Sequence, residues 1–259
     1  MHILLTNDDG VDAVGLYQLA FSLHSLAKIS IVAPAFEQSC TGHGITVNAP
    51  LRLHRANIPH SDQSWAVQGT PADCVKMALE HILKDKPDLV ISGINHGSNL
   101  GTDAIYSGTV SGAMEGYIYG LPAIAVSSTD AVSNFDLAAE FIKKIILWWK
   151  EKNFSPAAML NINVPPGKIK GAKYTKLGFR TYENAFEERI DPMGRKYFWL
   201  HGKVVDRGDM GKTDVEAVSN GFISVSPLQF DITDYITLNQ LQKNQTPSFF
   251  DEPSPNSNA

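Results

Sequence analysis

Short apolar runs that alternate with helical patterns constrain the fold of this chain more than any other feature. Most of these runs are almost entirely apolar, which is typical of parallel strands buried on both faces. Apolar residues at helical spacing follow the first run, at Leu16, Leu19 and Leu23. This alternation predicts an α/β fold, a Rossmann-like doubly wound, mostly parallel sheet with helices on both faces. The runs are Ile3–Leu5, Ile29–Ala33, Leu89–Ile91, Ala123–Val126 and Met159–Val164.

Local signals define several helices and loops. Thr70 is expected to cap a helix, with Asp73 completing a capping box. Further helices are predicted over 109–119 and 135–150. Two short strands are expected between the second and third apolar runs, and the stretches between strands that are rich in Gly, Ser and Asn are predicted loops. The predicted short strands are Leu51–Leu53 and Trp65–Val67, and the loops are 39–46 and 96–108.

The pattern changes after residue 166. Residues 172–205 are rich in aromatic and basic side chains, and the turn signal at 191–195 predicts β-hairpins. A short last helix around Ile236 is expected to start at Thr233. We therefore expect one domain over 1–259, with a β-rich C-terminal extension. Its predicted parts are an α/β core (1–165), the hairpin extension (166–210), a return to the core with the last helix (211–243) and a polar, disordered tail (244–259).

Composition and charge exclude several classes of function. The net charge is −5 and neither half of the chain is basic, which argues against duplex nucleic acid as a partner. Cys40 and Cys74 lack zinc-site spacing, so we expect free thiols in a reducing cytoplasm. The first strand begins at residue 2, so no signal peptide is expected, and the apolar run 145–149 is too short to span a membrane.

Two adjacent carboxylates, Asp8 and Asp9, follow the first strand. Open α/β sheets bind ligands at the carboxyl ends of their strands. Adjacent like charges raise each other's pKa unless a cation lies between them. A bound divalent metal would remove that repulsion, and we therefore expect a metal site here. The alternative is a solvated acidic turn without a ligand.

Asn95 and Ser39 follow other strands at the same predicted edge of the sheet. Asn95 offers a neutral amide oxygen, although Asn is also common in left-handed turns. Ser39 offers a hydroxyl, although a serine in a Gly-rich loop is often only a loop residue. Oxygen ligands of this kind suit Mg²⁺ or Mn²⁺. No nearby pair of His or Cys residues offers a competing site for a softer metal.

The segment Ser107–Gly108–Thr109 opens the predicted helix 109–119. One interpretation is a simple helix cap at Ser107 or Thr109. The other is a phosphate site, because free N–H groups, a hydroxyl and the helix dipole point to one spot. Asn99, with its neighbouring glycines, would shape the preceding loop and contact the phosphate. His43 and His96 lie in the two candidate loops and are candidate proton donors.

Long motifs in this chain closely resemble the SurE (survival protein E) family, over nearly the whole length. The resemblance implies a metal-dependent 5′/3′-nucleotidase. It also implies that Asp8, Asp9, Ser39 and Asn95 are the metal ligands and that Ser107 contacts the phosphate. The motifs are Ile3–Gly10, Ser92–Asp103, Tyr106–Ala113, Asn161–Pro165, Gly211–Asp214 and Ser224–Leu228.

The resulting hypothesis is a phosphomonoesterase that hydrolyses nucleoside 5′- or 3′-monophosphates, with short polyphosphate as a further candidate substrate. One Mg²⁺ or Mn²⁺ would polarise the phosphoryl group, and Asp8 or Asp9 would accept a proton from water. The family resemblance suggests a homodimer or homotetramer built through the hairpins. Many relatives carry a basic residue near the ligand serine, where this chain has Glu37–Gln38, and this leaves the substrate preference open.

Three alternatives remain open from the residues. A signalling receiver also pairs carboxylates after its first strand, but it needs an aspartate where this chain has Ser92–Asn95. A phosphatase that forms an aspartyl-phosphate would use Asp8 or Asp9 as its nucleophile. A non-catalytic nucleotide-binding protein would release no phosphate. A dinucleotide-binding enzyme is not expected, because no Gly-x-Gly-x-x-Gly follows the first strand.

Overall fold

The computed structural model describes residues 1–129, 134–151, 158–207 and 211–243. The chain forms two compact units, Met1–Leu228 and Gln229–Ala259. The predicted tail 244–259 lies outside the described residues. No helix in the described ranges is long and apolar enough to cross a membrane.

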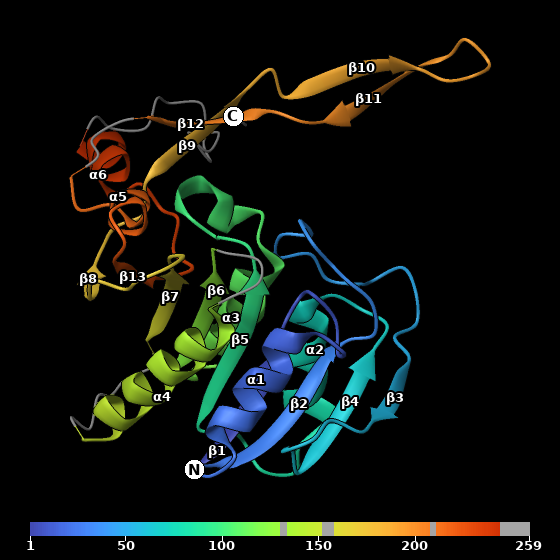
Figure 1. The fold of residues 1–259 in the computed structure, drawn as a ribbon, viewed down its shortest axis with the longest axis vertical. Helices are drawn as coiled ribbons and strands as arrows, with labels where there is room; N and C mark the ends of the chain where they lie inside the picture. The colour runs from blue at the N-terminus through green and yellow to red at the C-terminus, as the bar shows by residue number, and fades with distance from the viewer. Residues whose placement is uncertain (130–133, 152–157, 208–210, 244–259) are drawn as a thin grey trace, which may run out of the picture. The chain divides into compact units, whose positions relative to one another are not determined.

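A nine-stranded sheet forms the centre of the first unit, with the strand order β3-β4-β2-β1-β5-β6-β7-β13-β8 (Figure 1). The six strands from β4 to β7 pair in parallel, as predicted. β3 and β13 pair antiparallel with β4 and β7, so the sheet is mixed towards both edges. The strands are β1 (His2–Thr6), β2 (Lys28–Pro34), β3 (Leu53–Ala56), β4 (Gln63–Val67), β5 (Leu89–His96), β6 (Ala123–Ser128), β7 (Met159–Val164), β8 (Ala172–Tyr174) and β13 (Ile223–Leu228).

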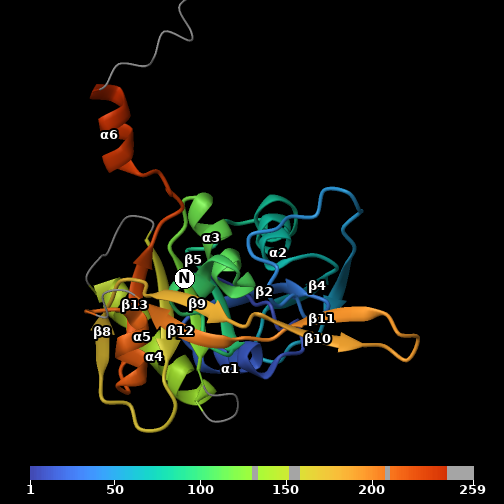
Figure 2. The same cartoon turned by 90° about the horizontal axis from the view of Figure 1, so that it is seen from above.

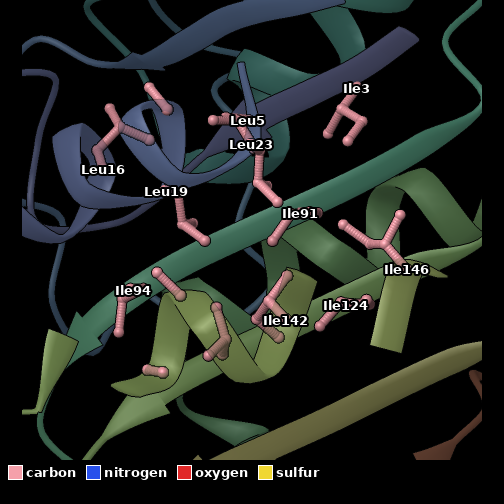
Figure 3. Close-up of a cluster of buried hydrophobic side chains, with 14 of the residues drawn as sticks. Ile3, Leu5, Leu16, Leu19, Leu23, Ile91, Ile94, Ile124, Ile142 and Ile146 are labelled. Carbon is pink, nitrogen blue, oxygen red and sulfur yellow. The ribbon is translucent and has the colours of Figure 1, made fainter. Parts of the chain in front are cut away.

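Helices cover both faces of the sheet, as the sequence predicts. α1 (Val14–Leu23) and α4 (Phe135–Glu151) pack on one face, and α2 (Pro71–Met77) and α3 (Gly108–Ile118) pack on the other. Figure 3 shows the core under α1 and α4, in which the labelled side chains are all Leu or Ile. The chain leaves β1 towards β2 on one side and later adds β5 on the other. The topological switch point, where such sheets bind ligands, therefore lies between β1 and β5.

α3 lies unusually close to the sheet because glycines face it. A Cβ on Gly112 would lie 2.8 Å from Ser92 Oγ and 3.0 Å from Thr6 Cγ2. A Cβ on Gly116 would lie 2.6 Å from a methyl group of Val90. Any larger residue at these two positions would push the helix away from β1 and β5.

The predicted hairpins are present but start later than expected. β8 joins the main sheet beside β13, because its backbone groups pair with that strand rather than with a hairpin partner. β10 (Phe186–Ile190) and β11 (Lys196–Leu200) form a hairpin, and β9 (Phe179–Glu183) pairs with β12 (Lys203–Arg207) at its base. Figure 1 shows them beyond the edge at which the parallel strands end, and Figure 2 views them from that side.

Several element boundaries differ from the predicted ones. The predicted capping box of Thr70 and Asp73 is present, and α2 continues into a wider turn, η1 (Ala78–Ile82). The predicted loop 96–108 contains a 3₁₀ helix, η2 (Gly101–Ile105). α5 (Asp214–Ser219) precedes β13. In the second unit, α6 (Tyr235–Lys243) is capped by Asp234 rather than by Thr233, since the Asp234 carboxylate accepts hydrogen bonds from two amides of the first turn.

Candidate functional site

The turn after β1 places two carboxylates at the switch point. Asp8 is only 5% exposed, and Asp9 is half-buried. Gly10 turns the chain with φ +100°, in the region that favours glycine, and packs against the backbone of Phe36. The Asn7 side-chain amide donates to Gly10 O at 2.7 Å, which fixes this turn.

Three separate segments meet at Asp8. Thr109 Oγ1, in the first turn of α3, donates to Asp8 Oδ1 at 2.6 Å. A Cβ on Gly108 would lie 2.8 Å from Asp8 Cβ, so only glycine allows this approach of the helix. Gln38 N, in the loop after β2, donates to Asp8 O at 2.7 Å. The N-terminus of α3 and the loop that carries Ser39 therefore both contact the turn after β1.

Asp9 faces the end of β5. The backbone N–H of His96 donates to Asp9 Oδ2 at 3.2 Å. Asn95 precedes it, next to a register shift between β5 and β6. Asn95 Nδ2 donates to Gly97 O at 3.0 Å, which leaves the amide oxygen available as a ligand atom. The structure thus brings the region of Asn95 to the acidic pair.

The loop that carries Ser39 is held in place at several points. Ser39 Oγ donates to Glu37 Oε1 at 2.6 Å, and the neighbouring Gln38 is bonded to the Asp8 backbone. Further along, His43 Nε2 lies 2.8 Å from Glu115 Oε2 on α3. Thr46 bonds the Asp73 carboxylate at the start of α2 through its amide and its hydroxyl.

Burial, more than repulsion between neighbours, sets the electrostatics of the acidic pair. Burial raises the pKa of Asp8 to about 6, the hydrogen bond from Thr109 opposes this, and the charge of Asp9 adds to it. Burial also raises the pKa of Asp9, against the opposing effect of the His96 amide and ring charge, and Glu37 adds to the rise. The sequence argument named only the like charges, which is the smaller cause for Asp8.

The donor set fits a hard divalent cation. Among the described residues, neither Asp8 nor Asp9 forms an ion pair with Lys or Arg. The buried Asn7 Oδ1 beside them has no hydrogen-bond partner in the described part of the chain. In the same ranges, no group of three or more His, Cys, Asp and Glu side chains is arranged for a metal. Carboxylate, amide and hydroxyl oxygens suit Mg²⁺ or Mn²⁺ better than zinc.

The N-terminus of α3 offers an anion site at the same place. Ser107 is the N-cap and accepts a hydrogen bond from Val110 N at 3.0 Å, which decides between the two predicted caps. The amides of Gly108 and Thr109 belong to the first turn, where N–H groups lack partners within the helix. The Thr109 hydroxyl is already bonded to Asp8. The predicted phosphate contacts and metal ligands therefore adjoin one another.

The other predicted residues have contacts of their own. Asn99 is buried and donates from its amide nitrogen to Ser127 Oγ at 2.8 Å. His43 is bonded to Glu115 through Nε2. The His96 side chain is exposed, and its charge lowers the pKa of Asp9. Of the two candidate proton donors, His96 is thus the one whose charge acts on the acidic pair.

Sequence reasoning missed two groups of polar residues around the site. Glu115 is a buried carboxylate on α3 that pairs with Lys76. Asn161 and Asn163 are buried on β7 and contact the loop after β5. Two asparagines at every second position of a strand predicted to be buried were a usable signal, because a buried amide needs a hydrogen-bond partner.

Comparison with known proteins gives a consistent result. The family model described as Survival protein SurE matches residues 3–184. A protein named 5′-nucleotidase SurE from Syntrophomonas wolfei is 47% identical over 94% of both chains. One of the same name from Heliobacterium modesticaldum is 48% identical over 93% of this chain and 90% of its own. The crystal structure of the SurE protein from Aquifex aeolicus aligns with a TM-score of 0.80 at 37% identity, covering 94% of this chain and 99% of that one. The family model matches most of the chain, and the relatives and the solved structure align with nearly its whole length. This chain therefore belongs to the SurE family.

Proposed function

We propose that this protein is a metal-dependent phosphomonoesterase that hydrolyses nucleoside 5′- or 3′-monophosphates to nucleoside and phosphate. The observation that carries the proposal is the buried Asp8 carboxylate, which lies against the N-terminus of α3 and forms no ion pair with a Lys or Arg of the described residues. A phosphate bound at this helix end would lie beside the negatively charged Asp8, and a divalent cation between the two would offset their repulsion. The relatives named 5′-nucleotidase SurE supply the substrate class.

One Mg²⁺ or Mn²⁺ would be held by Asp8, Asp9, Ser39 and Asn95. When bound, the ion supplies Lewis-acid chemistry, polarising the phosphoryl group and making water a stronger acid. Support comes from the oxygen-only donor set and from the Asn95 amide, whose nitrogen is already used by Gly97.

The phosphate would lie at the N-terminus of α3. The Ser107 hydroxyl accepts from Val110 N and can still donate its own hydrogen to a phosphate oxygen. The amides of Gly108 and Thr109 would stabilise charge on the equatorial oxygens. Asn99 is the fourth proposed phosphate contact, through the loop after β5. Asp8 or Asp9 would take the proton from the attacking water, and His96 is the proposed donor to the leaving oxygen.

Phosphate release from a panel of nucleotides and short polyphosphate, with Mg²⁺ or Mn²⁺ added, tests this function. We expect turnover of at least one nucleoside monophosphate with either metal, and its loss with a chelator. Absence of turnover with every metal would support a non-catalytic nucleotide-binding protein. A trapped aspartyl-phosphate on Asp8 or Asp9 would replace direct attack by water with the covalent alternative.

We also propose that the protein is a homodimer or homotetramer through the β10–β11 hairpin. Its apolar side chains are exposed on both faces, and a two-stranded hairpin is marginally stable by itself in water. The aromatic side chains occupy both strands, so a second copy of the arm is a suitable partner. The exposed residues are Phe186, Ile190, Met193, Phe198, Trp199 and Leu200.

Replacing Phe198 and Leu200 by Ser tests this assembly. We expect the mass in solution, measured by light scattering, to fall to that of a smaller assembly or a monomer. An unchanged mass would remove the arm from the interface. The protein is further proposed to act in the cytoplasm, since both Cys40 and Cys74 are free thiols.

A further inference from the structure

Two buried asparagines on β7 form hydrogen bonds with the backbone of the loop that follows β5. Asn163 Oδ1 accepts a hydrogen bond from Asn99 N at 2.8 Å, and Asn163 Nδ2 donates to Asn99 O at 3.1 Å. Asn161 Nδ2 donates to the same carbonyl at 2.8 Å. Both asparagines are fully buried. Three bonds from two side chains thus fix one peptide segment, as a neighbouring strand would.

The same loop is held from two other directions. The Asn99 side chain donates to Ser127 Oγ on β6. Two residues on, Gly101 N donates to Asp214 Oδ2 at 2.8 Å, and that carboxylate also accepts from Gly178 N at 2.7 Å. Asp214 is fully buried at the start of α5. The segments around 161–163 and 214 are more than 60 residues away in sequence but meet on residues 99–101.

A polar side chain buried inside a sheet stabilises the protein less than an apolar one of similar size. The exception is a side chain that forms hydrogen bonds with buried polar groups that would otherwise have none. Positions 161 and 163 lie in β7, between β6 and β13, where Leu or Val would pack without an unpaired polar atom. Neither residue contacts the acidic pair or the first turn of α3 through a described hydrogen bond. Their described side-chain hydrogen bonds all end on Asn99.

We propose that Asn161 and Asn163 are positioning residues for phosphate binding, acting through the backbone of Asn99. This inference rests on the proposed function, in which Asn99 contacts the phosphate. Asn95, the proposed metal ligand in the same segment, lies opposite Ser127 in the pairing of β5 with β6, and replacing the side chains of Asn161 or Asn163 leaves this backbone pairing in place. Loss of the hydrogen bonds from Asn161 and Asn163 to the Asn99 backbone should therefore weaken phosphate binding much more than metal binding.

The Asn163→Ala variant of the full chain tests the inference. We expect KM for AMP, or for the best nucleotide of the panel, and the inhibition constant of inorganic phosphate to rise together by about tenfold, the scale of losing an outer-shell partner. Mn²⁺ affinity, measured by electron paramagnetic resonance without substrate, should change less than about threefold. Asn161→Ala, which removes one bond of three, should give the same pattern with a smaller rise.

Asn134→Ala is the matched control. Asn134 is a buried asparagine that donates to Pro165 O at 2.7 Å, and this bond does not involve the loop after β5. The Asn134→Ala variant should have a lower thermal stability than the parent and the same inhibition constant for phosphate. Should Asn163→Ala fail to fold, Asn161→Ala carries the test alone.

Two results would overturn the inference. One is a folded Asn163→Ala or Asn161→Ala protein with the phosphate affinity of the parent. The other is an equal loss of phosphate and Mn²⁺ affinity, which would indicate a general structural role. If the parent protein binds Mn²⁺ and hydrolyses nucleotides in either case, the proposed function survives. If the parent does neither, both fail together.

Discussion

Two buried carboxylates lie along α3, and they differ in what surrounds them. Asp8, at the helix N-terminus, is 5% exposed, and Glu115, two turns along, is 4% exposed. Burial raises the pKa of Asp8 to about 6. For Glu115 burial also favours a rise, but the bonds from His43 and Lys76 outweigh it and the pKa lies below its ordinary value.

The difference lies in the cations. Lys76 Nζ lies 2.7 Å from the Glu115 carboxylate, so the chain supplies a cation to this group itself, and His43 Nε2 adds a contact at 2.8 Å. Asp8 has Thr109 and an acidic neighbour instead. A buried carboxylate supplied with its own cation serves the fold. One without a cation, at a sheet edge that binds ligands, is a candidate ligand for a cation from solution.

The largest expected effect is the loss of activity in Asp9→Ala. Removing a proposed metal ligand should lower kcat/KM by about three orders of magnitude, as the loss of a principal catalytic group does. The fold should survive, because the change relieves a repulsive pair. Phosphate release and circular dichroism measure the two properties. Full metal-dependent activity in this variant would contradict the ligand assignment.

Metal-free Asp8→Asn should be more stable than the parent by on the order of 3 kcal/mol above pH 6. The folded pKa of Asp8 is about 6 and its ordinary value is 3.8, so the folded state binds the extra proton. The parent therefore loses stability as pH rises from 3.8 to 6, and the variant does not lose this contribution. Urea unfolding at several pH values gives the difference. A constant difference across this range would show that Asp8 is not the titrating group.

Added Mn²⁺ should largely cancel this difference. At one hundred times its dissociation constant, a ligand stabilises the folded state by about 2.7 kcal/mol. We expect this gain in the parent and its loss in Asp8→Asn and Asp9→Ala. Thermal unfolding with and without the metal measures it. Equal stabilisation of all three proteins would locate Mn²⁺ elsewhere.

Glu115→Gln should have the smallest effect on function and the opposite effect on stability. Loss of the charge-assisted bonds to Lys76 and His43 should destabilise the protein by about 2 kcal/mol. The folded pKa of Glu115 is lowered, so its contribution is present above pH 4.5 and is lost as pH falls through the folded value. Activity should stay within tenfold of the parent.

Glu188→Gln, at an exposed ion pair with Lys196, is the control, and its free energy of unfolding should be nearly that of the parent. A larger loss of activity in Glu115→Gln would mean that the loop carrying Ser39 depends on this ion pair.

Signals that are local in sequence predicted their parts of the structure well. The apolar runs predicted the parallel strands, and Thr70 with Asp73 predicted the start of α2. The expectation that Asn95 follows its strand at the same edge of the sheet as the acidic pair is met, since the amide of the next residue, His96, donates a hydrogen bond to Asp9. That expectation needed only the rule that parallel strands end on the same side.

Features that depend on distant pairing could not be predicted. β8 pairs with β13 about fifty residues later, and β9 pairs with β12 around an inner hairpin. The contact of His43 with Glu115 spans 72 residues, and that of Asn163 with Asn99 spans 64. No local pattern distinguishes such partners from other polar residues, because the choice depends on the packing of the finished sheet.

The glycine face of α3 limits how this site can adapt. Gly108, Gly112 and Gly116 place the helix backbone directly on Asp8 and the sheet, so helix and strands form one rigid wall. A single added methyl group along this contact would be transmitted to the carboxylates as a displacement. We therefore expect bulkier substrates to be accommodated by the loops around residues 35–46 and 97–106. Changes of substrate specificity in this protein are expected to arise from substitutions in those loops, while the packing of α3 on the sheet stays the same.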